Sequence, residues 1–159
     1  MTEIMKAILL EDTVLLVKML EAGHDVNFQD DDGRTPLMQA VIDQHIEMAT
    51  LLIQYGAHVN MQDYLGETAA LHFAAQNNSA EITEVLLKNG AEIDLEDING
   101  NTPLSDAIFY FRGDEKVIQQ LLKHEADRER KNKHDVSPLE LARSIGGTVL
   151  SLLLGADSK

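Results

Sequence analysis

A short phrase that recurs along the chain at nearly constant spacing constrains the fold more than any other feature. It begins with glycine, continues through a threonine and usually a proline, ends on leucine, and has a weaker copy near the C-terminus. The copies are Gly33–Leu37, Gly66–Leu71, Gly100–Leu104 and Asp135–Leu139. Their hydroxyl residues are Thr35, Thr68, Thr102 and Ser137, so the period is 33 to 35 residues. Such a period predicts a stacked repeat protein rather than a closed globule, and stacked repeats present long binding faces.

Each copy of the phrase has the features of a turn that leads into a helix. Gly33 and Gly100 favour a positive φ in the turn, because glycine has no Cβ to clash there. Thr35, Thr102 and Ser137 can each cap a helix with a side-chain oxygen. The proline that follows each of them suits the first helical position, where its missing N–H has no partner to lose.

A second apolar run follows the first predicted helix in each unit. The runs are Met48–Ile53, Ile82–Leu87 and Val117–Leu122. Their spacing predicts a helix with one wide buried face. Gly56 and Gly90 stand just past the first two runs, which is typical of a helix C-terminus. An extended polar stretch then leads to the next turn, so each unit is predicted to be turn, helix, turn, helix and protruding loop.

This order of elements resembles the ankyrin repeat. The family pattern is G-x-T-P-L-H-x-A-A, a leucine-rich second helix and then G-A-D-V-N, and residues 66–94 match it closely. The resemblance covers almost the whole chain and implies an all-α fold, an ankyrin-repeat solenoid of stacked helix-turn-helix units with protruding loops. We expect a single ankyrin-repeat domain over residues 1–159. Its five units are expected at 1–29, 30–62, 63–96, 97–131 and 132–159.

Three units depart from the family pattern. Unit three has an extra alanine within Thr68–Leu71 and no proline, so its first helix is expected to start earlier or to carry a bulge. Unit four has two extra residues around 111–112, and Glu125 stands where the family has glycine. Unit five has Asp135 in place of glycine, and its second helix, within 147–155, is expected to be about three residues short. Terminal units are expected to be atypical, because one face lacks a neighbour.

The charge balance of the chain limits the classes of partner. The 159 residues include 13 Lys and Arg against 27 Asp and Glu, for a net charge of −14. We expect neither nucleic acid nor a membrane surface as a partner, because both require clustered basic side chains. A basic protein is the natural electrostatic complement, and the alternative is that the acidity only keeps the protein in solution. With no cysteine, signal peptide or long apolar stretch, we expect a cytoplasmic, monomeric protein.

The residues that carry catalysis or bind metals do not form recognisable motifs. Asp30–Gly33 could suggest a calcium loop, but the frame would put Phe28 at its first position and Gln39 at its last. None of the six histidines lies three or four residues from another, and no nucleophile elbow or phosphate loop is present. We therefore expect no metal, no cofactor and no enzymatic activity. A site assembled from distant units remains an alternative. The resemblance implies a structural role for His72, with hydrogen bonds between turns.

Aromatic residues are few, and three of them are consecutive at 109–111. A helix turns 100° per residue, so these three cannot all face one core. One interpretation is that they fill space left by the lengthened unit, with Phe109 as the first candidate. The other is that one of them is exposed and contacts a partner, with Tyr110 as the first candidate.

Tyr64 and Leu65 occupy the predicted loop tip where unit two has Asp31 and Asp32. The ankyrin resemblance implies that such tips, together with the nearby first helices, line a concave binding face. The residues expected to bind a partner are Asp31, Asp32, Arg34, Asp43, Tyr64, Leu65, Glu67, Gln76, Asn77, Ile98, Asn99, Asn101 and Tyr110. This mixture of apolar and charged side chains is typical of a protein interface.

Two functional hypotheses follow from these residues. The first is a non-catalytic protein–protein interaction module that presents a rigid concave acidic face, with Tyr64, Leu65 and Tyr110 supplying most of the affinity. The alternative is a dedicated inhibitor or immunity protein that sequesters a basic enzyme such as a nuclease toxin. Self-assembly through the imperfect end units is a further possibility.

Overall fold

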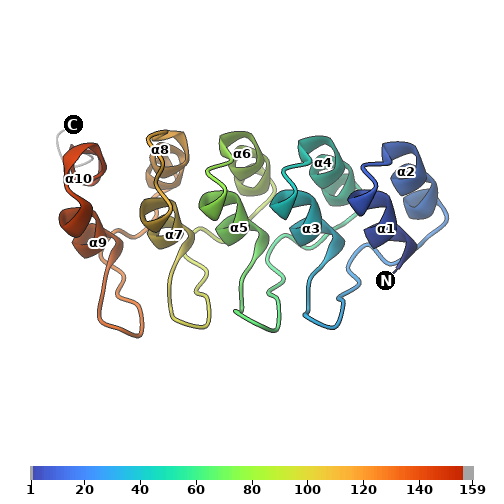
Figure 1. The fold of residues 1–159 in the computed structure, drawn as a ribbon, viewed down its shortest axis with the longest axis horizontal. Helices are drawn as coiled ribbons and strands as arrows, with labels where there is room; N and C mark the ends of the chain where they lie inside the picture. The colour runs from blue at the N-terminus through green and yellow to red at the C-terminus, as the bar shows by residue number, and fades with distance from the viewer. Residues whose placement is uncertain (1, 156–159) are drawn as a thin grey trace.

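Five helix pairs stand side by side in a row in the computed structural model, which describes residues 2–155 (Figure 1). The helices are α1 (Glu3–Leu9), α2 (Thr13–Glu21), α3 (Pro36–Ile42), α4 (Ile46–Gln54), α5 (Ala70–Gln76), α6 (Ala80–Lys88), α7 (Pro103–Phe109), α8 (Lys116–Lys123), α9 (Pro138–Ile145) and α10 (Gly147–Gly155). Long loops project from the row along one edge, and α1 and α10 lie at its opposite ends. The predicted all-α solenoid is therefore confirmed.

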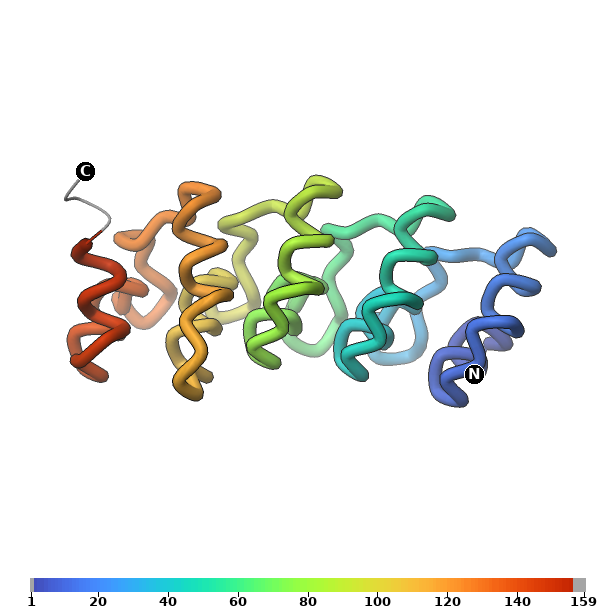
Figure 2. Tube along the Cα trace, turned by 90° about the horizontal axis from the view of Figure 1, so that it is seen from above, coloured from blue at the N-terminus to red at the C-terminus, as the bar shows by residue number. Residues whose placement is uncertain are grey.

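The helices form two layers, and each helix packs against its partner and its neighbours in the row. The first helices α1, α3, α5, α7 and α9 make one layer, and the second helices make the other (Figure 2). Between the layers lie fully buried side chains such as Ile8, Leu16, Leu52, Leu86 and Leu121. Helices of seven to nine residues are marginal alone in water. Stacking on neighbours therefore supplies the stability, as expected for a repeat array.

The first helices begin at the caps that the sequence predicted. Thr35, Thr102 and Ser137 are N-caps whose side-chain oxygens accept a hydrogen bond from the backbone N–H three residues on. Donor–acceptor distances are 3.1, 3.4 and 3.2 Å. A proline occupies the first helical turn in each case. These caps satisfy part of the unpaired N–H groups that every helix start presents.

Unit three absorbs its extra residue in the loop, and the expectation of an earlier helix start or a bulge is wrong. Helix α5 has seven residues, as α3 does, and its N-cap is Ala69 rather than Thr68. Asp63 N–H donates to the carbonyl of Thr68, one residue farther than the matching bond from Asp30 to Arg34. The loop tip accommodates the extra residue more easily than the helix does, because lengthening the loop breaks no helical hydrogen bond.

The connections between helices account for the other two departures. Residues 110–115 join α7 to α8, whereas three residues, 43–45, join α3 to α4, so the predicted lengthening of unit four is confirmed. In unit five the prediction of a short second helix is wrong. Helix α10 has nine residues, the same as α4, and the shortening falls on its connection, which is Gly146 alone.

Side chains at equivalent loop positions fasten each unit to the next. Asn27 donates through Nδ2 to the Gly56 carbonyl (3.1 Å) and accepts from the His58 N–H (2.8 Å). Asn60 makes the same pair of bonds one unit farther on, at 3.0 and 2.8 Å. Because these bonds satisfy backbone groups at the second-helix ends, they fix where the loops leave the helical layers.

His72 joins two turns, as the resemblance implied. Its Nδ1 accepts from the Ala69 N–H (3.3 Å), so Nε2 carries the proton and donates to the Asn101 carbonyl (3.1 Å). The ring is fully buried, and burial lowers the pKa of His72 below its ordinary value. A neutral imidazole with both nitrogens bonded therefore connects unit three to unit four.

Candidate protein-binding face

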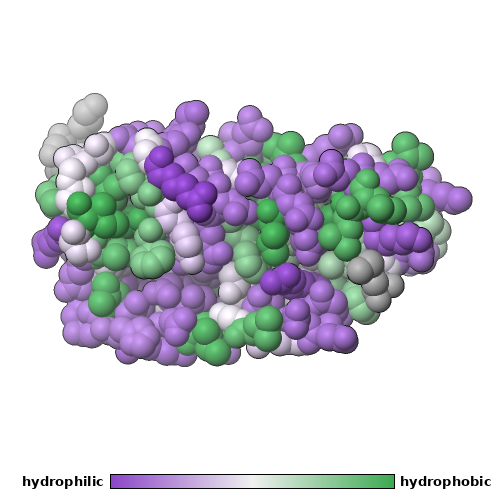
Figure 3. Space-filling model, in the orientation of Figure 1, coloured by the Kyte–Doolittle hydropathy of each residue, from purple (hydrophilic) through white to green (hydrophobic). Residues whose placement is uncertain are grey.

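The loop tips carry most of the side chains that were predicted to bind a partner, and these side chains are exposed. The exposed tip residues are Asp31, Asp32, Tyr64, Leu65, Glu67, Ile98 and Asn99. Tyr64 and Leu65 leave 64% and 63% of their surface in solvent. In the space-filling view, apolar patches interrupt a hydrophilic surface along the loop edge below α5 and α7 (Figure 3). Apolar tips therefore sit beside acidic ones along one edge of the molecule.

Neighbouring tips are linked through their backbones. The N–H of one tip donates to a carbonyl of the preceding tip, in the pairs Tyr64 to Asp32 (2.9 Å), Ile98 to Gly66 (2.8 Å) and Lys133 to Asn99 (2.9 Å). These backbone bonds could not be predicted from the sequence, because they depend on the path of each loop rather than on its side chains. The bonds hold the tips as one continuous edge, so little ordering entropy would be lost when a partner binds.

Tyr64 also packs against the preceding tip. Its hydroxyl donates to Gln29 Oε1 at 3.2 Å. A Cβ placed on Gly33 would lie 2.5 Å from both the Tyr64 ring and the Tyr64 backbone nitrogen, so only glycine fits beneath it. Gly33 also has a φ of +79°, whereas in the longer tip the corresponding left-handed residue is Glu67, with a φ of 50°. Tyr64 is thus both an exposed side chain and part of the loop framework.

The remaining predicted residues are less accessible and serve the fold as well. Arg34 and Asn101 are half-buried at the base of their tips, where their backbone N–H groups donate to Asp30 and Asp97 (both 2.8 Å). Asn77 donates through Nδ2 to the carbonyl of Ile42 (3.2 Å) and so caps the neighbouring helix.

Two further predicted residues of the face lie at first-helix ends. Asp43, the C-cap of α3, accepts from Gln39 Nε2 at 2.7 Å. Tyr110, the C-cap of α7, is 39% exposed.

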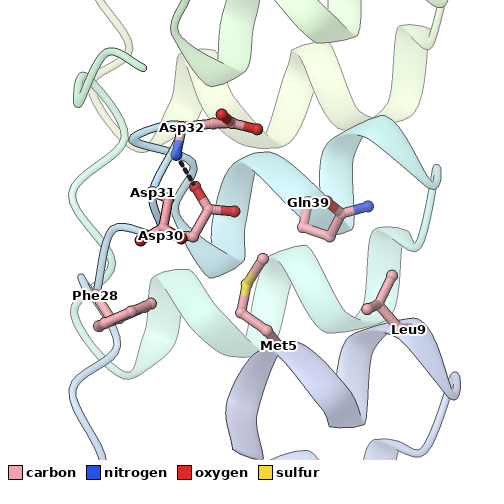
Figure 4. A pocket seen from close by; sticks show the side chains of 7 residues that line it. All are labelled: Met5, Leu9, Phe28, Asp30, Asp31, Asp32 and Gln39. Atoms are coloured by element: carbon pink, nitrogen blue, oxygen red, sulfur yellow. Dashed lines mark hydrogen bonds between the residues drawn. The ribbon is translucent and has the colours of Figure 1, made fainter. Parts of the chain in front are cut away.

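One hollow lies where the first loop tip faces α1 and α3, and we call it the N-terminal hollow. It has a volume of about 320 Å³. Its lining consists of Met5, Leu9, Phe28, Asp30, Asp31, Asp32 and Gln39 (Figure 4). The Asp32 N–H donates to Asp30 Oδ1 at 3.0 Å, which shapes the acidic tip. The apolar contribution of Met5, Leu9 and Phe28 was not anticipated, because unit one lacks the repeated phrase.

A second hollow of about 340 Å³ lies between units three, four and five, and we call it the C-terminal hollow. Its lining includes Gln76 of α5, Asp106 and Phe109 of α7, Leu141 of α9 and the loop residues Asn101 and Asn132. Asn132 Nδ2 donates to Asn101 Oδ1 at 2.7 Å, so two successive loops join at its wall. Gln76, Asn99, Asn101 and Tyr110 of this lining were predicted from the sequence to lie on the binding face, whereas Asp106 and Phe109 were not.

The aromatic triplet beside this hollow corrects one expectation. Phe109 is 67% exposed and does not fill the core, whereas Phe111 is the member that packs against it. The Phe109 and Tyr110 rings meet edge to face, with centroids 5.0 Å apart. Phe109 is the last residue of α7, and the lengthened connection begins directly after it.

Asp106 is the carboxylate with the most unusual environment. It is 7% exposed, and Oδ2 accepts from Gln76 Nε2 at 2.9 Å. Burial raises the pKa of Asp106 to about 7, the Gln76 hydrogen bond opposes this rise, and the negative charge of Asp97 adds to it. The side chain therefore gives up its proton at a much higher pH than an exposed aspartate does.

The described residues provide no metal centre. Across residues 2–155, no three histidine, aspartate or glutamate side chains converge in a way that could hold an ion. The same part of the chain contains no helix of the length and apolarity needed to cross a membrane.

Comparison with known proteins places this architecture in a family. A family model described as ankyrin repeats (3 copies) matches residues 4–97 and 71–159. The chain belongs to the ankyrin-repeat family. Ankyrin repeats are in general protein–protein interaction modules, and the exposed loop tips of this ankyrin-repeat protein fit that class.

Curated relatives of this ankyrin-repeat protein occur in viruses and animals. It is 32% identical over 143 residues to the putative ankyrin repeat protein FPV031 of Fowlpox virus (strain NVSL), covering 86% of the chain and 42% of the relative. It is 37% identical over 150 residues to the nuclear factor NF-kappa-B p105 subunit of Gallus gallus, and this match covers 89% of the chain and 14% of the relative. It is also 37% identical over 95 residues to the B-cell lymphoma 3 protein homolog of Mus musculus, and this match covers 59% of the chain and 20% of the relative. The chain thus spans less than half the length of each of these relatives.

Proposed function

We propose that this chain is a non-catalytic protein-binding module whose loop tips and first helices form the contact surface for a basic partner. The observation that carries the proposal is the edge of backbone-linked tips, where the acidic tip with Asp31 and Asp32 is followed by the exposed apolar tips with Tyr64, Leu65 and Ile98. Exposed aromatic and aliphatic anchors supply binding energy, and surrounding charges select the partner and speed its encounter. In this proposal the module acts as a cytoplasmic monomer.

The net charge of −14 is the reason for proposing a basic partner. Opposite charge accelerates association, and this contribution declines as salt screens it. The same charge also favours a narrower alternative, in which the chain is a dedicated inhibitor of one basic enzyme such as a nuclease toxin. That alternative requires a single tight partner, whereas a general adaptor would have several weaker ones.

The proposal is tested by capturing binding proteins from the native host's lysate and measuring kinetics with the purified partner. We expect a basic protein whose association rate falls steeply between low and moderate salt. A rate that does not respond to salt would remove electrostatics from the mechanism. Failure of every captured protein to bind the purified chain would contradict a binding function.

A further inference from the structure

The C-terminal hollow contains a carboxylate that the protein itself does not neutralise. Asp106 is 7% exposed, and of its two oxygens only Oδ2 has a hydrogen bond, the one from Gln76, within the described chain. No ion pair involves Asp106 in residues 2–155, and the charged group that acts on it, Asp97, is also negative. A buried ionised carboxylate without a counter-ion destabilises the protein, and a positive group supplied by a partner would relieve that cost.

The walls of the hollow indicate which positive group fits. Phe109 and Tyr110 expose their rings at the rim, and Val136 and Leu141 add apolar surface. A guanidinium stacks on aromatic faces, sheds water more readily than an ammonium, and offers five N–H donors in one plane. Asp106 Oδ1 and Gln76 Oε1 accept no hydrogen bond within residues 2–155, so both can receive such donors.

We propose that the C-terminal hollow receives an arginine side chain of a partner protein, with the guanidinium paired to Asp106 and the aliphatic stem against Phe109 and Leu141. This inference rests on the proposed protein-binding function and names the chemistry of the partner. The hollow is formed before binding, since Asn132 is bonded to Asn101 and Asn101 Nδ2 to Asp97 Oδ2 at 3.3 Å. The walls therefore need little ordering when the side chain enters.

Binding at this site is coupled to protonation. Asp106 must be ionised to pair with a guanidinium, so affinity increases as pH rises through the region near 7. The titratable groups on the helices packed against α7 are His72 of α5, Lys116 and Lys123 of α8, and Glu140 and Arg143 of α9, and Asp97 lies in the loop before α7. Of these groups, Asp97 is the one whose charge acts on Asp106.

The probe for the site is N-acetyl-arginine methylamide, titrated into the ¹⁵N-labelled chain and followed by NMR. We expect shifts concentrated at the Gln76 side-chain amide and the backbone of Asn101 and Tyr110, larger at pH 8 than at pH 5.5. The neutral citrulline analogue should bind at least about tenfold more weakly, because it lacks the charge that pairs with the carboxylate. Equal binding of the two compounds, or shifts confined to Asp30–Asp32, would overturn the proposal.

Matched variants separate this site from the general binding function. Asp106→Asn keeps the side-chain shape and should raise the Kd for the arginine probe at least about tenfold, whereas Glu81→Gln, at an exposed position of α6, should not change it. If Asp106→Asn leaves probe binding unchanged while a captured partner still binds the loop tips, the arginine site is wrong and the proposed function stands. If the probe binds at Asp106 but no protein binds the chain, the arginine site stands and the proposed function fails.

Discussion

The N-terminal and C-terminal hollows are similar in size and both contain acidic side chains, but they hold those side chains differently. Asp31 and Asp32 of the N-terminal hollow are exposed on a loop tip, where water and salt screen their charge. Asp106 of the C-terminal hollow is buried on a helix, and its pKa is raised to about 7. The N-terminal hollow therefore attracts positive charge in general. The C-terminal hollow instead offers a single site for one cationic group, and burying the Asp106 carboxylate there lowers the stability of the protein.

The largest effect is expected from a change that disrupts the tip of the N-terminal hollow. Gly33→Ala places a Cβ 2.5 Å from the Tyr64 backbone nitrogen, at a φ of +79°. We expect a loss of about 3–5 kcal/mol in the free energy of unfolding, measured by urea denaturation, because backbone strain and a clash add. Gly56→Ala is the control, since its φ of +91° is similar but its Cβ would meet nothing within 4 Å. Its expected cost is about 1–2 kcal/mol, and equal losses for the two variants would contradict the packing of Tyr64 on Gly33.

A second effect distinguishes the buried carboxylate from the exposed ones. The pKa of Asp106 is raised from 3.8 to about 7 in the folded state, so folding favours its protonated form. The contribution of this group to the free energy of unfolding is therefore fully present below about pH 4, and this contribution is lost as pH rises toward 7. Asp106→Asn removes that loss and should be more stable than wild type by roughly 2–4 kcal/mol at pH 8, with little difference at pH 4.

The matched control for that measurement is Asp31→Asn, in the exposed tip. Because its side chain is exposed on the loop tip, the substitution should change the free energy of unfolding by less than about 0.5 kcal/mol. Urea denaturation at the two pH values checks both variants. A difference between wild type and Asp106→Asn that does not change with pH would show that Asp106 is not held in a desolvated site.

The smallest effects concern the aromatic triplet beside the C-terminal hollow. Phe111→Ala should lower the free energy of unfolding by about 2 kcal/mol, because its ring packs against the core. Phe109→Ala should lower it by less than about 1 kcal/mol, since most of that ring is already in solvent. Urea denaturation of the two variants provides the comparison, and a reversed order would mean that Phe109, not Phe111, is the packed residue.

The fold could be predicted from the sequence because the repeated phrase combines caps, prolines and apolar spacing that all favour the same elements. The same phrase misled at unit three, where Thr68 matches the phrase but Ala69 occupies the N-cap position. Loop tips tolerate an extra residue without losing helical bonds, and only the backbone path shows where that residue goes.

The candidate site was predictable only where it follows the repeat register. Tip residues such as Tyr64 and Leu65 could be placed by analogy between units. Asp106 and Phe109 could not be placed in this way. Asp106 is buried and Phe109 is exposed because of how units three, four and five pack together. A single-unit pattern contains no information about that packing.

The central claim is that partners bind the side formed by loop tips and first helices, and calorimetry with the captured partner tests it most directly. The variant is the double substitution Tyr64→Ala and Phe109→Ala, and the control is Tyr55→Ala, an exposed aromatic at the end of α4 in the other layer. The account predicts a rise in Kd of about a hundredfold for the double variant, roughly tenfold for each anchor, and no change for the control. An unchanged Kd for the double variant, or an equal rise for Tyr55→Ala, would contradict it.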